Sequence, residues 1–201
     1  MLSDAVLRRR ELVLADLIPG TLVKDVLLVL GFAALTGLSA QVSIRLPFTP
    51  VPITGQTLAV LLGGMALGAP RAILGMLAYL GIGLVGLPWF AGGAGGWAVV
   101  GSASFGYLLG FILAAAVVGA LAARGFDRGP LRVLLAMVAG NLLIYLVGAT
   151  WLALDLHLGV AAAISLGVTP FLLGDALKAA IAMGLLPGAW RLAGRRPELP
   201  G

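Results

Sequence analysis

The sequence contains no cysteine, few charged residues and a single histidine. Only 10% of its 201 residues are Asp, Glu, Lys or Arg. Without cysteine the chain has no disulfide scaffold, no thiol nucleophile and no cysteine zinc site. His157 lies near Asp155, but one histidine without further ligands makes a poor metal site. We therefore predict no metal and no cofactor.

Motifs for catalysis are also missing. The sequence has no phosphate-binding Gly-x-x-x-x-Gly-Lys motif, no His-Glu-x-x-His motif and no nucleophile with a base beside it. Residues 92–96 are rich in glycine, but no strand is expected before them, so no nucleotide site is predicted. We expect that the chain is not an enzyme and cannot hydrolyse ATP by itself. An intramembrane acyl or prenyl transferase stays open as an alternative.

Apolar residues dominate the sequence instead. They make up 61% of it, and the mean hydropathy is +1.11, whereas an ordinary soluble domain is roughly 45–50% apolar. A membrane-spanning helix needs about 20 apolar residues. We predict an all-α polytopic membrane protein, a bundle of six transmembrane helices. The uncharged apolar runs place these helices over residues 23–42, 55–68, 70–87, 104–124, 130–154 and 170–190.

Proline and threonine mark the expected starts of three of these helices. Pro70, Pro130 and Pro170 stand where a first helical residue would be. Thr169 is placed as the cap of the last helix. The 30 glycines agree with a helix bundle in lipid, where close backbone packing requires small residues.

The positive charge lies almost entirely on one side of the predicted helices. Arg45 alone falls in the opposite loops, and Lys178 falls inside a span. By the positive-inside rule both termini are cytoplasmic, and the net charge of +5 reflects topology rather than binding of nucleic acid. The basic side carries eleven of the thirteen Lys and Arg residues: Arg8, Arg9, Arg10, Lys24, Arg71, Arg124, Arg128, Arg132, Arg191, Arg195 and Arg196.

The two ends of the chain are predicted to lie outside the bundle. Residues 1–22 form an amphipathic cytoplasmic segment, residues 23–190 the six-helix domain and residues 191–201 a basic cytoplasmic tail. Within the first segment we predict an interfacial helix over residues 4–18, with Leu7, Leu14 and Ile18 on one side. A polar tail without this helix is the alternative.

Two loops on the less basic side do not resemble solvated loops. Residues 43–55 read SIRLPFTPVPITG, and residues 86–97 read GLPWFAGGAGGW. Irregular backbone near a membrane is tolerated only where it is buried in protein or lines a cavity. We predict that both loops fold back over the outer mouth of the bundle, and that the first completes the short helix at 55–68. The alternative is two tight turns with interfacial aromatic side chains.

Asp175 and Lys178 are the only ionisable residues deep within a predicted span. Each costs about 2.5–3.5 kcal/mol to insert on the lenient scale. Their i, i+3 spacing places them on one helix face, where they can neutralise each other. Lysine suits a ligand carboxylate and aspartate suits N–H donors, so we predict a ligand site. A structural ion pair without a ligand is the alternative.

Other polar residues are weaker candidates. Asn141 and Tyr145 share a helix face, although an inter-helix hydrogen bond explains Asn141 equally well. Gln56 and Thr54 stand at the start of the second helix and are predicted to line the site. Thr57 is expected to bond back to its own helix.

Four runs of the sequence together resemble the BioY family, the biotin-specific substrate-binding (S) components of energy-coupling-factor transporters. The resemblance covers about residues 25–185. The runs are TPVPITGQTLAVLL at 49–62, GLPWFAGG at 86–93, GYL with GF at 106–111, and PFLLGDALK at 170–178.

This resemblance implies a six-helix bundle that binds biotin on its outer side. The implied partners are biotin, membrane lipid, a transmembrane coupling (T) subunit and two cytoplasmic ATPase subunits, in the cytoplasmic membrane of a prokaryote. Ala33 and Gly37 are the small-residue pair expected to face the coupling subunit. The predicted substrate-binding residues are Asp175, Lys178, Asn141, Tyr145, Gln56, Thr54, Trp89, Phe90, Gly92, Gly93 and Tyr107.

One segment departs from the family pattern. Where members usually read Gly-Pro-Thr-Gly-Gly-Tyr, this chain reads GSASFGY over residues 101–107, so the cavity wall is expected to differ there. Two further functions stay open: an S component for another small carboxylated vitamin, and a stand-alone carrier in which self-association into a homo-oligomer replaces the coupling subunit.

Overall fold

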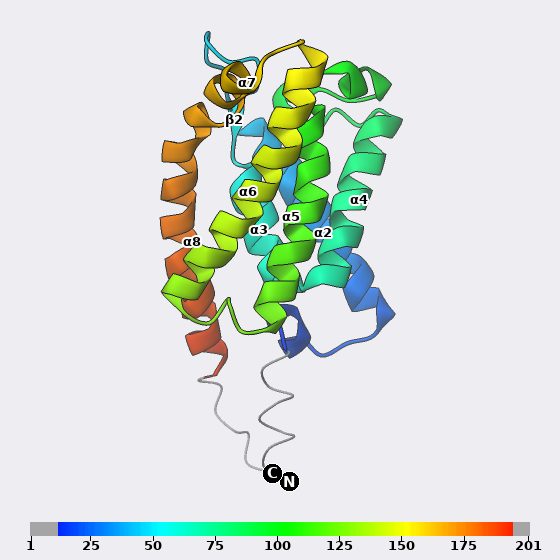
Figure 1. The fold of residues 1–201 in the computed structure, drawn as a ribbon. Coiled ribbons are helices and arrows are strands. Elements are labelled where there is room, and N and C mark those ends of the chain that lie inside the picture. The colour runs from blue at the N-terminus through cyan, green and yellow to red at the C-terminus, as the bar shows by residue number, and fades with distance from the viewer. Residues whose placement is uncertain (1–11, 195–201) are drawn as a thin grey trace, which may run out of the picture.

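The computed structural model describes residues 12–194, and these form a bundle of helices (Figure 1). The helices that correspond to the six predicted spans begin and end within three residues of the expected bounds. They are α2 (Leu22–Gln41), α3 (Gln56–Leu67), α4 (Ala69–Val85), α5 (Phe105–Ala123), α6 (Pro130–Asp155) and α8 (Leu172–Ala193).

Short elements occupy the connections. The helix α7 (Val160–Gly167), which was not predicted, lies between α6 and α8. The strands β1 (Ser43–Ile44) and β2 (Ile53–Thr54) pair antiparallel between α2 and α3. Four 3-10 helices complete the described chain: η1 (Leu14–Leu17), η2 (Ala91–Gly93), η3 (Trp97–Gly101) and η4 (Thr169–Phe171).

Some of the described helices are long enough to cross a membrane, and others are shorter. The helices α2, α5 and α6, and the stretch Val160–Ala193 that contains α7 and α8, are long and apolar enough to cross a membrane. The helix α3 has 12 residues and is therefore about 18 Å long, against a hydrocarbon core of about 30 Å. The segment 43–55, which was predicted to complete this helix, leads directly into its first turn and contains the hairpin of β1 and β2, which was not predicted (Figure 1).

The predicted helix starts are confirmed in part. Pro130 is the first residue of α6, and Pro70 lies in the first turn of α4. Pro170 belongs instead to the 3-10 helix η4, and α8 begins two residues later. Thr169 was wrongly predicted as a cap. Its hydroxyl donates backward to the carbonyl of Ile164 at 3.3 Å, because the turn of η4 separates it from α8.

The described part of the N-terminal segment is not the predicted α-helix. Residues 4–11, with Leu7, lie outside the described residues, and residues 14–17 form the 3-10 helix η1. The Asp16 carboxylate caps the start of η1, where it accepts from the backbone N–H of Val13 at 3.1 Å, and it joins η1 to α4, where it accepts from Nη1 of Arg71 at 2.7 Å. Leu14 packs against the core while Ile18 is exposed, so the two do not share one face.

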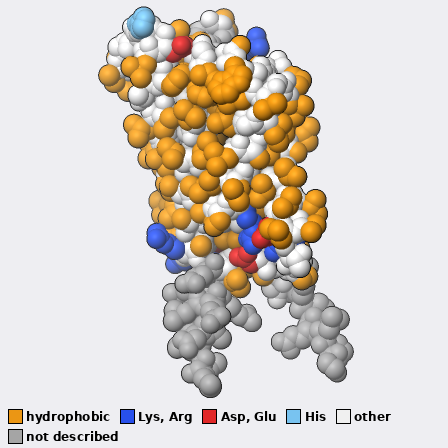
Figure 2. Space-filling model, turned by 90° about the vertical axis from the view of Figure 1, so that its right-hand side faces the viewer, with side chains coloured by type: hydrophobic (Ala, Val, Ile, Leu, Met, Phe, Trp, Pro, Cys, Tyr) orange, Lys and Arg blue, Asp and Glu red, His pale blue; other side chains and the backbone are white. Residues whose placement is uncertain are grey.

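The bundle is built around α5, which packs against α3, α4 and α6 (Figure 1). Close contact requires small residues on α5. A Cβ atom on Gly119 would lie 2.5 Å from the backbone nitrogen of Ala69, at the start of α4. Such contacts are how helices associate where lipid removes the hydrophobic drive. The face in Figure 2 agrees, since apolar side chains cover its middle and charged ones gather towards its ends.

A buried carboxylate closes the end of the bundle where both described chain ends lie. Asp127, in the loop between α5 and α6, is fully buried and accepts from Nε1 of Trp190 on α8 at 2.6 Å. Burial raises the pKa of Asp127, and the Trp190 hydrogen bond opposes that rise. The guanidinium of Arg128 lies 4.6 Å from the centre of the Trp190 ring. These contacts attach the last turns of α8 to the α5–α6 loop.

Candidate functional site

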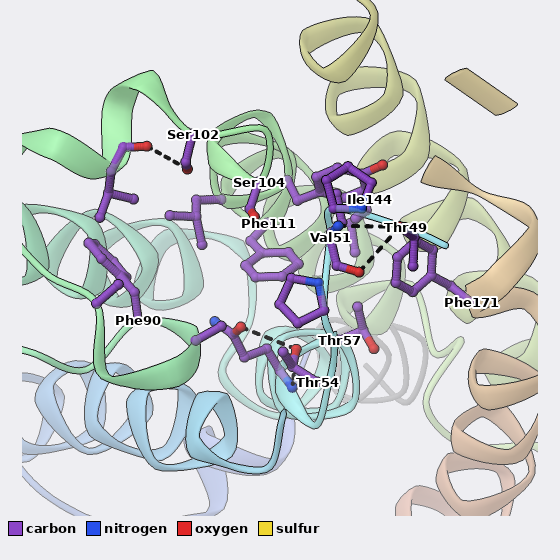
Figure 3. Close-up of a pocket in the computed structure, with 18 of the residues that line it drawn as sticks. Thr49, Val51, Thr54, Thr57, Phe90, Ser102, Ser104, Phe111, Ile144 and Phe171 are labelled. Carbon is purple, nitrogen blue, oxygen red and sulfur yellow. Dashed lines mark hydrogen bonds between the residues drawn. The ribbon is translucent and has the colours of Figure 1, made fainter. Parts of the chain in front are cut away.

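A cavity of about 590 Å³ lies at the opposite end of the bundle (Figure 3). Its walls come from both predicted loops, from the first turns of α3, α5 and α8 and from the middle of α6, and most of its surface is apolar. The side chains that form the apolar wall include Val51, Phe90, Leu108, Phe111, Ile144 and Phe171.

The two loops fold back over this cavity, as the sequence predicted. The second loop, residues 86–97, is held against α2. The side-chain amide of Gln41, at the end of α2, donates to the carbonyl of Trp89 at 3.1 Å. The hydroxyl of Thr49, in the first loop, donates to the carbonyl of Leu166 at 2.7 Å. The first loop is therefore attached to α7, which provides a support that the sequence did not reveal.

A polar cluster of four side chains lies in this otherwise apolar wall. Nζ of Lys178 donates to Oδ1 of Asp175 at 2.8 Å, so the predicted ion pair is confirmed. The hydroxyl of Tyr145 on α6 donates to Oδ2 of Asp175 in a short hydrogen bond. The fourth member is Thr57, which donates to Oδ1 of Asp175 at 3.1 Å and accepts from Lys178 at 2.6 Å.

The role predicted for Thr57 was therefore wrong. Its hydroxyl does not bond back to α3 but joins the two charged groups of α8. The first turn of α3 lies against α8, and two strong hydrogen-bonding groups outcompete a carbonyl that is already used within the helix. The cluster thus links α3, α6 and α8 through one carboxylate.

The cluster is neutral overall but keeps free hydrogen-bonding capacity. An ammonium has three N–H donors and a carboxylate has about four acceptor positions. The described contacts use two donors of Lys178 and three acceptor positions of Asp175. Within residues 12–194, one donor of Lys178 and one acceptor position on Oδ2 of Asp175 therefore remain, which suits a ligand group that both accepts and donates.

A second set of polar contacts lies beside the cluster. The amide of Gln56 donates to the hydroxyl of Tyr79 at 2.8 Å, and Thr54 donates to the Gln56 carbonyl oxygen at 3.2 Å. Thr54 and Gln56 line the cavity as predicted. Gln56 has only 3% of its surface exposed, so its conformation is set by Tyr79 behind it.

The structure brings most predicted site residues to the cavity and leaves four away from its wall. The seven that line it are Thr54, Gln56, Phe90, Tyr107, Tyr145, Asp175 and Lys178. Trp89 packs instead against Gly37 and donates to the carbonyl of Tyr79 at 3.0 Å. The other three that do not line the cavity are Gly92, Gly93 and Asn141.

Physical reasons for these differences are visible. Phe90 is only 2% exposed and turns towards the cavity, which leaves the neighbouring Trp89 to pack against α2 and α4. The carbonyl oxygen of Asn141 is buried and has no hydrogen-bond partner within residues 12–194. Within the described residues, this oxygen therefore does not make the inter-helix hydrogen bond that was the alternative explanation for Asn141.

Ala33 and Gly37 do not form an accessible face for a coupling subunit. Ala33 is 1% exposed, and a Cβ atom on Gly37 would lie 2.8 Å from the indole of Trp89. Small residues on α2 thus allow close packing within the bundle. The sequence could not distinguish this from an external contact, because both require small side chains at four-residue spacing.

Five polar or charged residues of the cavity wall were missed by the sequence analysis: Arg45, Thr49, Thr57, Ser102 and Ser104. Thr57 belongs to the polar cluster, and Arg45 lines the cavity from the first loop. A signal for Arg45 was present, since it is the one basic residue of the outer loops. In the segment that departs from the family pattern, Ser102 and Ser104 line the cavity.

The fold defines a multi-pass membrane protein with a cavity near one end. The model of the BioY family matches residues 9–195, and the chain belongs to that family. It is 39% identical over 160 residues to the probable biotin transporter BioY of Pyrococcus horikoshii, covering 80% of this chain and 92% of that protein. It is 37% identical over 167 residues to the biotin transporter BioY of Rhizobium etli, covering 79% and 89%.

A solved structure shares the fold. Its description is the crystal structure at 2.1 Å of the S-component for biotin from an ECF-type ABC transporter. The TM-score is 0.76 at 22% identity, and the match covers 89% of this chain and 96% of that chain. At this identity the likeness establishes the fold alone.

The polar cluster should contribute to stability even without a ligand. We expect Thr57→Val to lower the free energy of unfolding by about 1–3 kcal/mol, because Asp175 loses a donor and Lys178 loses an acceptor in apolar surroundings. Thermal unfolding of the purified, ligand-free protein in detergent measures this change.

Thr150→Val is the matched control for this substitution. The hydroxyl of Thr150 is exposed and bonds only to the carbonyl of Leu146 in its own helix. The control should change the stability by about 0.5 kcal/mol or less. Equal unfolding temperatures for the two variants would show that Thr57 does not hold the cluster together.

Proposed function

We propose that this chain binds biotin in the cavity and supports biotin uptake as the S component of an energy-coupling-factor transporter. The observation that carries the proposal is the neutral polar cluster of Asp175, Lys178, Thr57 and Tyr145 in an aromatic, apolar cavity, within a chain of the BioY family. Biotin offers matching chemistry, since its bicycle consists of an apolar ring fused to a polar ureido ring.

The size and composition of the cavity support a small ligand. Its volume of about 590 Å³ lies within the usual range of roughly 300–1,000 Å³ for small-molecule sites. Phe90 and Tyr107 supply apolar surface, and ionisable groups this deep in a span are expected to serve function. An S component for another small carboxylated vitamin is the runner-up, since pocket walls can change while the fold stays.

The partners in this proposal are a transmembrane coupling subunit and two cytoplasmic ATPase subunits. The sequence carries no phosphate-binding motif of its own, so ATP hydrolysis must come from other chains. The buried Ala33 and Gly37 are left out of the docking surface. A stand-alone carrier that works as a homo-oligomer is the alternative.

The orientation belongs to the same proposal. We place the cavity on the outer side of the cytoplasmic membrane of a prokaryote, with both termini in the cytoplasm. The side that holds Arg71, Arg124, Arg128 and Arg132 then faces the cytoplasm, as the positive-inside rule requires. Residues 1–22 and 191–201 are assigned to the cytoplasmic ends, and residues 23–190 to the membrane domain.

Lys178→Ala should remove most biotin binding. The substitution leaves Asp175 without its counter-ion and removes the free donor of the cluster, and breaking a buried pair costs about 3–5 kcal/mol. Equilibrium binding of labelled biotin to the purified protein measures the loss. Lys24→Ala is a control with the same change at the other end of the bundle, where Lys24 pairs with Asp25 at 3.5 Å. An unchanged dissociation constant for Lys178→Ala would refute the assigned role.

Competition with other carboxylated vitamins separates biotin from the runner-up ligands. We expect unlabelled biotin to displace labelled biotin at far lower concentration than any of them. Displacement by another vitamin at lower concentration than biotin would transfer the proposal to that vitamin.

Concentrative uptake should require the other subunits. In cells that lack coupling and ATPase subunits, expression of this chain alone should give surface-bound biotin but no accumulation against a gradient. Adding those subunits should restore accumulation. Equal accumulation in both strains would favour the stand-alone carrier.

The absence of cysteine makes the orientation directly testable. A cysteine introduced at His157 should react with a membrane-impermeant maleimide in intact cells, whereas a cysteine at Arg132 should react only after lysis. The opposite pattern would reverse the proposed orientation.

A further inference from the structure

Arg45 is a second cation at the cavity and differs from Lys178 in its surroundings. It follows β1 in the first loop and lines the cavity. Its guanidinium reaches the second loop, because a Cβ atom on Gly92 would lie 2.5 Å from Nη2 of Arg45. Gly92 has a φ of +71°, so glycine there serves both the backbone turn and the space for Arg45.

No carboxylate of the described chain neutralises Arg45. It takes part in none of the ion pairs found within residues 12–194. Among residues 12–194, Asp175 is the only acidic residue on the cavity wall, and it is already paired with Lys178. The loop side of the cavity therefore carries a net positive charge, while the cluster on the helix side is neutral.

These two polar regions suit different chemical groups. The cluster offers one free donor on Lys178 and one free acceptor on Asp175, which match the C=O and N–H of a cyclic urea. A ligand carboxylate placed there would have two acceptor oxygens beside the negative charge of Asp175, which is repulsive. A guanidinium without a counter-ion, by contrast, can bind both oxygens of a carboxylate.

We infer that Arg45 recognises the carboxylate of the ligand at the loop side of the cavity, while Asp175 and Lys178 hold its ureido group at the helix side. This assignment rests on the proposed function and fixes the orientation of the ligand in the cavity. It moves the carboxylate from Lys178, where the sequence alone placed it, to Arg45. Arg45 is then the residue that selects ligands with an acidic side chain.

The test compares biotin with its primary amide, biotinamide, in which a neutral group of the same size replaces the carboxylate. Binding of both is measured for the unsubstituted protein and for Arg45→Gln, Lys178→Ala and the control Arg132→Gln. Arg132 lies at the other end of the bundle, so its variant makes the same charge change away from the cavity.

The expected result is selective for the carboxylate. Arg45→Gln should weaken biotin about five- to tenfold, more at low ionic strength, and leave biotinamide within about twofold. Lys178→Ala should weaken both ligands by similar factors, and Arg132→Gln neither. If Lys178→Ala instead removed the preference for biotin over biotinamide and Arg45→Gln did not, the orientation would be reversed.

Two further outcomes would overturn the inference. One is an equal loss of biotin and biotinamide on Arg45→Gln, which would show that Arg45 supports the loops rather than the carboxylate. The other is binding of neither ligand by the unsubstituted protein, which would overturn the proposed function as well. An equal loss of both ligands on Arg45→Gln, with both still bound by the unsubstituted protein, concerns Arg45 alone, so the two failures are distinguishable.

Discussion

Two opposite charges buried within a membrane bundle must remain neutralised, and this constraint organises the site. Asp175 accepts hydrogen bonds from three side chains on three helices, and Lys178 supplies the matching charge. A buried carboxylate that lost these donors would carry a large desolvation cost. Polar contacts therefore join three parts of the bundle: the first turn of α3, the middle of α6 and the start of α8.

The two loops cover the cavity, and the cluster forms a polar part of its wall. Thr49 attaches the first loop to α7, and Gln41 attaches the second loop to α2.

Close helix packing explains most of the remaining sequence. Gly119 lets α5 approach the start of α4, and Gly37 accommodates the indole of Trp89. The same small residues could equally have served an external partner, and only their burial separates the two uses. At the far end, Asp127 and Trp190 attach α8 to the α5–α6 loop. The bundle is thus tied by polar contacts at both ends and packed by small residues between them.

The sequence by itself determined the six helices α2, α3, α4, α5, α6 and α8, the ion pair of α8 and the covering role of the two loops, but not the helix α7. Hydrophobic runs set helix length, i, i+3 spacing sets the face shared by Asp175 and Lys178, and Pro-rich and Gly-rich segments exclude helix. Tertiary structure alone decided that Thr57 joins the cluster, that Arg45 reaches the cavity, and that Trp89 and Ala33 pack inside the bundle. The reason is physical: periodicity tells which side of its own helix a residue occupies, whereas the neighbour that covers that side is set by the packing of the whole bundle.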